Sequence, residues 1–148
     1  EALLQDLLAD RYFALPPPKS TGFEYFNLAW LEESLKAHPT LSPADVQSTL
    51  CELTAFAIAD SIKEHFAAPQ DVIVCGGGVH NRDLMARLGN RVHPATLQTS
   101  AAFGLDPDWV EAAAFGWLAM RTLAVEPGNL AAVTGALRPA ILGGIYSP

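Results

Sequence analysis

The amino-acid sequence predicts an α/β fold in which helices outnumber strands. One short apolar run, residues 72–75 of a strand expected at 71–75, has the pattern of a strand that is buried on both faces of a sheet. Several longer segments place apolar residues at helical spacing, and three consecutive glycines join the strand to one of these helices. One or two strands make a thin sheet, so we expect the sheet to continue in another part of a longer parent chain.

Three helices are expected ahead of the strand. The first ends near residue 15, because a proline triplet follows and cannot continue it. The second covers residues 25–37, and the third covers residues 43–66. Ser42 is a candidate cap for the third helix and Pro43 suits its first turn. This third helix has the strongest signals in the chain.

After the strand the sequence predicts two more helices and a weak strand. A short helix covers residues 82–88, and the weakly signalled strand lies within residues 91–99. Asp106 then caps a helix that starts at the following proline and ends near residue 124. From residue 126 the chain is rich in glycine and proline, which predicts a loop-rich tail.

Composition bounds the class of protein and its partners. The 148 residues are 50% hydrophobic, which is enough for one domain with a core. The formal net charge is −7 and the nine basic residues are scattered, so we expect no nucleic-acid partner. No apolar run has the length of a membrane helix, so we expect a cytoplasmic protein without a membrane span. The chain begins at Glu1 inside a helical pattern, which suggests a fragment.

The cysteines and histidines give no sign of a disulfide framework or a metal site. Cys51 falls in a predicted helix and Cys75 in the predicted strand, where both are expected to be small core residues. The four histidines show neither the spacing of a helical metal pair nor a neighbouring Cys-x-x-Cys motif. We therefore expect no bound metal among these residues.

The glycine run Gly76, Gly77 and Gly78 is the first candidate site. Glycine permits positive φ and lets a ligand lie against the backbone, and Asn81 can cap the following helix. The position after a strand predicts a ligand crevice at the carboxyl end of the sheet. The run fits neither the dinucleotide fingerprint nor the P-loop, and a tight turn without a ligand remains the alternative.

Two further polar features have a structural and a functional interpretation. Glu111 is the only ionisable residue between Trp109 and Met120, so it either lines a ligand crevice or faces water near a helix N-terminus. The run Lys19-Ser20-Thr21 could reach an anionic or sugar ligand, but a surface turn is the simpler interpretation.

Five blocks of this sequence together resemble the carboxyl-terminal part of the anhydro-N-acetylmuramic acid kinases, which belong to the actin-like ATPase and sugar-kinase superfamily. They are PKSTGFEYFNLAWL from Pro18, CGGGVHNRDLM from Cys75, GLDPDWVEAAAFGWLA from Gly104, GNLAAVTGA from Gly128 and ILGGIY from Ile141. Phe23 departs from the basic residue expected after KSTG, so no charge role is assigned there. The resemblance implies that residues 1–148 form most of the second of two ribonuclease-H-like lobes, with a returning tail from about residue 126.

The resemblance also implies an activity and a role for each candidate residue. Such a kinase uses ATP and Mg²⁺ to convert 1,6-anhydro-N-acetylmuramic acid to N-acetylmuramic acid 6-phosphate, with water opening the anhydro bridge, during cell-wall recycling. By position, Gly76, Gly77 and Gly78 would lie along the nucleotide, Asn81 would cap the helix behind them, and Glu111 would hold the sugar or the attacking water. The phosphate loop and the general base lie outside these residues, so the fragment alone is expected to be inactive.

Other interpretations stay open beside this one. Another sugar or acetate kinase of the same superfamily would keep the glycine run and change the residues on the sugar side. A non-catalytic nucleotide-binding lobe would bind ATP without turnover. Expected partners are the sugar substrate and the missing amino-terminal lobe, and the sequence leaves a homodimer open.

Overall fold

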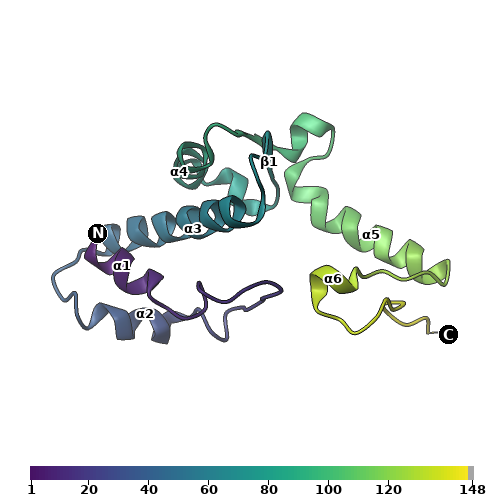
Figure 1. Ribbon diagram of the computed structural model, residues 1–148, viewed down its shortest axis with the longest axis horizontal. Helices are drawn as coiled ribbons and strands as arrows, with labels where there is room; N and C mark the ends of the chain where they lie inside the picture. The colour runs from purple at the N-terminus through teal and green to yellow at the C-terminus, as the bar shows by residue number, and fades with distance from the viewer. Residues whose placement is uncertain (147–148) are drawn as a thin grey trace.

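The computed structural model describes residues 1–146 and divides into two visibly different halves (Figure 1). The first half contains helices α1 to α4 and a small sheet, while α5 and α6 form an arm that extends from it. In chain order the elements are α1 (Ala2–Leu8), α2 (Leu28–Leu35), α3 (Pro43–His65), β1 (Asp71–Val74), the 3₁₀ turn η1 (Gly77–His80), α4 (Arg82–Val92), β2 (Thr96–Thr99), the 3₁₀ turns η2 (Ser100–Phe103) and η3 (Pro107–Trp109), α5 (Val110–Leu123) and α6 (Ala131–Thr134).

The sheet has two parallel strands, with Asp71 opposite Thr96 and Val74 opposite Thr99. The α/β class with an excess of helices is therefore confirmed, and the weakly signalled second strand exists. The prediction that β1 is buried on both faces is wrong, because Ile73 is 52% exposed. Side chains alternate along a strand, and the helices of residues 1–146 cover only the face that carries Val72.

That covered face rests on the main core between α3 and α4. Ala55 and Ala59 of α3 pack against Leu88 and Val92 of α4, with the valines of β1 and Leu97 of β2 at the border. An ion cluster also joins these two helices, since Glu52 of α3 pairs with Arg87 and Arg91 of α4. The expected helix at residues 82–88 extends to Val92 because its last turn contributes to this core.

A second core joins α1 and α2 to the middle of α3. Leu3 and Leu7 of α1 are almost fully buried against Leu53 of α3, with Trp30 and other partly buried residues around them. The predicted α3 is confirmed from its first residue, and the hydroxyl of Ser42 accepts the Asp45 N–H at 3.2 Å. The expected helix at residues 25–37 is shorter in the structure and spans Leu28–Leu35.

The first helix ends at Leu8 and not near residue 15, so that prediction is wrong. Asp10 is the reason, because its carboxylate accepts hydrogen bonds from the Tyr12 N–H at 2.8 Å, the Tyr25 hydroxyl at 2.9 Å and the Trp30 indole at 2.9 Å. Side-chain bonds of this kind compete with the helix. Burial alone would raise the pKa of Asp10, but these hydrogen bonds and the nearby Arg11 charge outweigh it and lower the pKa.

The arm consists of α5 and a tail that folds back along it. The Gly128 N–H donates to the Ala140 carbonyl at 3.0 Å, and the Thr122 hydroxyl donates to the Leu142 carbonyl. The tail includes the single-turn helix α6, which the loop-rich pattern did not predict. No residue of α5 is buried among residues 1–146. No helix in this described part of the chain is long and apolar enough to cross a membrane.

Candidate functional site

The glycine turn directly follows β1 and leaves space above its backbone. Gly76 has φ +77°, so the prediction of a positive φ is confirmed there, whereas Gly77 and Gly78 have no positive φ and belong to η1. A Cβ atom added at Gly76 or Gly77 would meet no other atom within 4 Å. The turn is therefore open to a ligand that lies against the main chain.

Helix α4 starts immediately behind this turn, and Asn81 is its cap as predicted. The Asn81 Oδ1 atom accepts the Leu84 N–H at 3.0 Å, and the Asn81 N–H donates to the Gly78 carbonyl at 3.1 Å. The cap thus fixes the turn to the first turn of α4. Uncapped N–H groups at such a terminus favour negative charge, which suits a phosphate group.

The carboxyl end of β2 lies beside the glycine turn, because β1 and β2 are parallel and Val74 is opposite Thr99. Ser100 follows at this edge with 8% of its surface exposed, and its hydroxyl has no hydrogen-bond partner in residues 1–146. Sequence reasoning missed this residue. The polar Thr-Ser pair at the end of the weak strand was the available signal.

The cysteine at the end of β1 is exposed, so the prediction that Cys75 is a core residue is wrong. Cys75 lies one residue beyond the strand, on the way to the turn. Cys51 is half-buried on α3, and burial, the first of several causes, raises the pKa of its thiol. A raised pKa keeps this thiol neutral and unreactive at neutral pH.

The start of α5 is attached to the glycine turn at two places. The Gly76 N–H donates to the Pro107 carbonyl at 2.9 Å, and His80 Nε2 lies 3.0 Å from both carboxylate oxygens of Asp108. Asp106 caps this segment as predicted, since its Oδ1 atom accepts the Asp108 N–H at 2.9 Å. The Asp108 carboxylate itself faces the histidine.

Glu111 lies in the first turn of α5, shortly after these attachments. Its carboxylate is exposed, and none of residues 1–146 forms an ion pair or side-chain hydrogen bond with it. The structure therefore brings its helix terminus to the glycine turn, but no hydrogen bond joins Glu111 to the glycines within that range. Its assignment to a sugar or a water molecule stays a prediction.

The Lys19-Ser20-Thr21 loop has a structural role at its first residue. The Lys19 ammonium donates to the carbonyls of Tyr12 at 3.2 Å and Phe13 at 2.9 Å and lies 5.1 Å from the Tyr12 ring centroid. It thus satisfies backbone groups freed where α1 ends early. This favours the interpretation of the segment as a surface turn.

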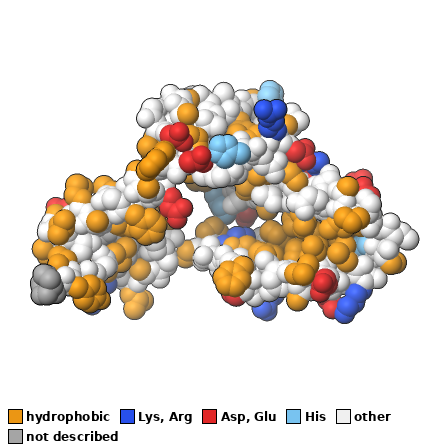
Figure 2. All heavy atoms as spheres, turned by 180° about the vertical axis from the view of Figure 1, so that it is seen from behind, with side chains coloured by type: hydrophobic (Ala, Val, Ile, Leu, Met, Phe, Trp, Pro, Cys, Tyr) orange, Lys and Arg blue, Asp and Glu red, His pale blue; other side chains and the backbone are white. Residues whose placement is uncertain are grey.

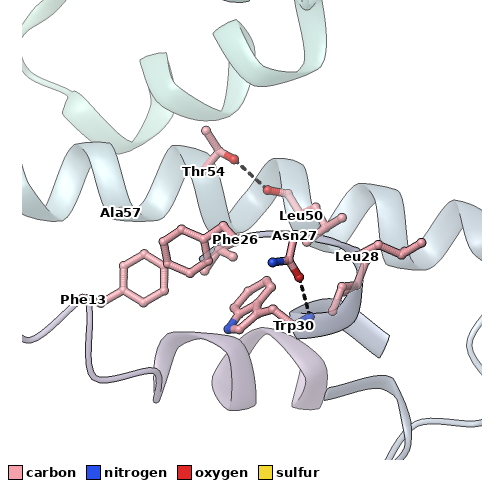
Figure 3. Close-up of a pocket in the computed structure, with 10 residues that line it drawn as sticks. Phe13, Phe26, Asn27, Leu28, Trp30, Leu50, Thr54 and Ala57 are labelled. Carbon is pink, nitrogen blue, oxygen red and sulfur yellow. Dashed lines mark hydrogen bonds between the residues drawn. The ribbon is translucent and has the colours of Figure 1, made fainter. Parts of the chain in front are cut away.

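An apolar cavity of about 550 Å³ lies between α2 and α3 and does not involve the glycine turn (Figure 3). Phe13, Phe26 and Trp30 form much of its wall. Its polar groups are already paired, since Asn27 accepts the Trp30 N–H and the Thr54 hydroxyl donates to the Leu50 carbonyl. This lining does not suit a sugar or a phosphate.

No cluster of three or more metal-ligating side chains occurs in the described residues.

Comparison with known proteins tests the family resemblance that the five sequence blocks indicated. A family model described as "Anhydro-N-acetylmuramic acid kinase" matches residues 1–148. The chain is similar to proteins of that name from three bacteria. It is 54% identical over 145 residues to the one from Xanthomonas campestris pv. campestris, covering 98% of this chain and 38% of the relative. It is 49% identical over 146 residues to the one from Pseudomonas savastanoi pv. phaseolicola, covering 99% of this chain and 40% of the relative. It is also 49% identical over 150 residues to the one from Saccharophagus degradans, covering 100% of this chain and 40% of the relative. The chain therefore spans about two fifths of their length.

Proposed function

The chain belongs to the anhydro-N-acetylmuramic acid kinase family, and we propose that it supplies the nucleotide-side lobe of an enzyme with that activity. In this proposal the whole enzyme phosphorylates 1,6-anhydro-N-acetylmuramic acid with ATP while water opens the anhydro bridge. The product is N-acetylmuramic acid 6-phosphate. The observation that carries the proposal is the open backbone at Gly76 and Gly77, next to the capped start of α4.

The residues at this edge fit a nucleotide. Without side chains, Gly76 and Gly77 allow the close approach of a flat or anionic group to the main chain. ATP supplies the γ-phosphoryl group, and phosphoryl transfer depends mainly on positioning and on stabilising charge. We include Mg²⁺ in the proposal because it would neutralise the negative charge of the phosphates in such a reaction. The phosphate loop and the general base are assigned to the part of the enzyme outside these residues.

We assign Glu111 to the sugar side, where it holds the sugar or the attacking water. Its support is an exposed carboxylate without a partner in residues 1–146, on a helix that starts beside the glycine turn. An unpaired carboxylate can accept a hydrogen bond from a hydroxyl group or a water molecule without first breaking an ion pair.

The test of this assignment uses the whole parent enzyme and coupled ATP turnover. Glu111→Gln keeps the shape of the side chain and removes its charge, so we expect kcat to fall about 100-fold or more. Glu33→Gln is the control, because Glu33 is an exposed residue of α2 that pairs with Lys36. Unchanged kcat and unchanged KM for the sugar in Glu111→Gln would contradict the assignment.

The nucleotide side is tested separately with Gly77→Val. The backbone has room for this side chain and no positive φ, so the variant should fold. Its methyl groups would enter the space assigned to the nucleotide, and the KM for ATP should rise by about 10-fold or more, since 1.4 kcal/mol of lost contact has that effect. The KM for the sugar is the internal control. An unchanged KM for ATP places the nucleotide elsewhere.

The remaining parts of the proposal concern the rest of the enzyme. We propose that residues 1–148 form its second lobe, with the tail from about residue 126 returning along α5. The support is the apolar and exposed surface of α5, which needs a covering partner such as the amino-terminal lobe. We place the enzyme in the cytoplasm, and a homodimer is the assembly to test by its mass in solution. ATP binding without turnover in the whole protein would favour a nucleotide-sensing lobe.

A further inference from the structure

We propose that His80 and Asp108 form a positioning pair that holds the glycine turn in register with the start of α5. The inference rests on the proposed function, since it gives the two segments their roles on the nucleotide and sugar sides. The pair itself is visible in the structure, with His80 Nε2 at 3.0 Å from each oxygen of the Asp108 carboxylate.

The pair is the second of two links between segments that are far apart in the sequence. The first link is the main-chain hydrogen bond from Gly76 to Pro107, at the beginning of the glycine turn. His80 is the last residue of that turn and contacts Asp108, which follows Pro107. One hydrogen bond allows two segments to rotate about it, whereas a second link fixes their relative orientation.

The surroundings of the pair indicate that it orients the two segments and contributes little to the stability of the fold. The side chains of His80 and Asp108 are 67% and 53% exposed, and exposed ion pairs contribute little to the free energy of folding. Asp108 is in turn held by the Asp106 cap, which accepts its N–H at 2.9 Å. The carboxylate that His80 faces is therefore fixed by its own backbone.

The consequence for the reaction follows from what each segment carries. Gly76 and Gly77 precede His80 in the glycine turn, and Glu111 follows three residues after Asp108 in the other segment. A small shift between the two segments would change the distance between the nucleotide and the sugar without removing a contact to either. Misplacement of about 1 Å can cost roughly 100-fold in rate, so such a shift matters for kcat.

The first measurement is amide hydrogen exchange in the whole parent protein, which does not depend on activity. In His80→Ala we expect faster exchange both in the glycine turn and in η3, because their shared link is lost. The matched control is His38→Ala, which removes another histidine–aspartate contact, His38 to Asp6 at 2.7 Å. It should leave exchange at both segments unchanged. Unchanged exchange in His80→Ala overturns the proposal.

The second measurement is steady-state kinetics of the same variants. We expect His80→Ala and Asp108→Ala each to lower kcat by about 10-fold, with smaller changes in both KM values, and the double variant to lose no more than either single variant. His80→Gln should recover most of kcat, because its amide can donate to Asp108 from a similar position. The Tm of each variant should move by less than about 4 °C.

The outcomes separate this inference from the proposed function. Faster exchange with unchanged kcat overturns the positioning role, as does a His80→Gln variant that is as slow as His80→Ala. Additive losses in the double variant also overturn it, because the two residues would then act independently. A wild-type protein without sugar-dependent ATP turnover contradicts the proposed function, while faster exchange in His80→Ala still supports the link.

Discussion

Helices α3 and α5 both carry large apolar side chains, but only those of α3 are buried in the structure. Three residues of α3 are buried, and α1, α2 and α4 all pack against it. In α5 no residue is buried, and Phe115 and Leu123 are 63% and 72% exposed. Figure 2 shows hydrophobic side chains at the surface of both halves, including the α5 half at the left. The difference teaches that an apolar helix is buried only where a partner covers it.

The charged groups show the same contrast between the two halves. Glu52 of α3 joins Arg87 and Arg91 of α4, so each side of the packed contact has an ion-pair partner. On α5, Arg121 pairs with Glu126 of the adjoining tail and lies 5.4 Å from the Trp117 ring centroid, while Glu111 has no such partner in residues 1–146. The contact between α3 and α4 thus has paired charges, whereas α5 carries a carboxylate that is free for further contacts among the described residues.

The largest expected effect distinguishes the exposed helix α5 from the packed core around α3. Phe115→Ala should change the free energy of unfolding of residues 1–148 by less than about 0.5 kcal/mol, because the ring is exposed there. In the whole parent protein the same change should cost about 3–5 kcal/mol, if another part of the enzyme covers α5. Urea unfolding of both proteins measures the difference.

Leu88→Ala is the matched contrast, because Leu88 is 2% exposed in the core between α3 and α4. It should cost about 2–5 kcal/mol in residues 1–148 and in the whole protein alike. If Phe115→Ala has an equally small effect in both proteins, α5 stays uncovered in the whole enzyme. A missing partner would then not explain why α5 is exposed in residues 1–146.

A smaller effect is expected at the ion cluster of the packed half. Hydrogen bonds from Arg91 and then Arg87 hold the pKa of Glu52 below its ordinary value of 4.5. This lowered pKa stabilises the fold at pH values above the unfolded-state pKa, and the contribution is lost as pH falls through the folded-state pKa. Glu52→Gln should therefore cost about 1.5–3 kcal/mol at neutral pH and progressively less below about pH 4.5.

Urea unfolding across this pH range measures that effect. Glu33→Gln is the control, since its pair with Lys36 is exposed and should contribute less than about 1 kcal/mol at any pH. A cost for Glu52→Gln that does not depend on pH would show that the charge of this residue is not what stabilises the contact.

The smallest expected effect concerns the boundary between the glycine turn and the packed half. Asn81→Ala removes the cap of α4 and should cost about 1 kcal/mol, whereas Asn81→Ser keeps a capping oxygen and should cost less. Thermal unfolding of the two variants gives the comparison. If they are equally destabilised, the Asn81 side chain does not stabilise the helix through its cap.

The features predicted correctly from sequence depend on neighbours in the chain. Ser42, Asn81 and Asp106 all cap the segments assigned to them, because a cap is a bond between residues two or three positions apart. The errors concern distant contacts. The end of α1 depends on bonds from Asp10 to Tyr25 and Trp30, which no local pattern reveals.

The candidate site also has a part that the sequence could predict and a part that it could not. The glycine turn and its position after a strand were predictable, since their residues are consecutive in the sequence. The link from His80 to Asp108 was not, because it joins residues 28 positions apart across the carboxyl edge of the sheet. The hydroxyl of Ser100 was missed for another reason, since the Thr-Ser pair in the sequence does not reveal that this hydroxyl is buried without a partner in residues 1–146.

By itself the sequence determined the helix-rich α/β class, the glycine turn, the helix caps and the blocks that indicated the family. These are local patterns, and the backbone bonds that they specify form between nearby residues. Only the tertiary structure decided which face of β1 is covered, where α1 ends and what holds the turn against α5. Those outcomes depend on contacts between distant segments, whose free energies exist only once the chain has folded.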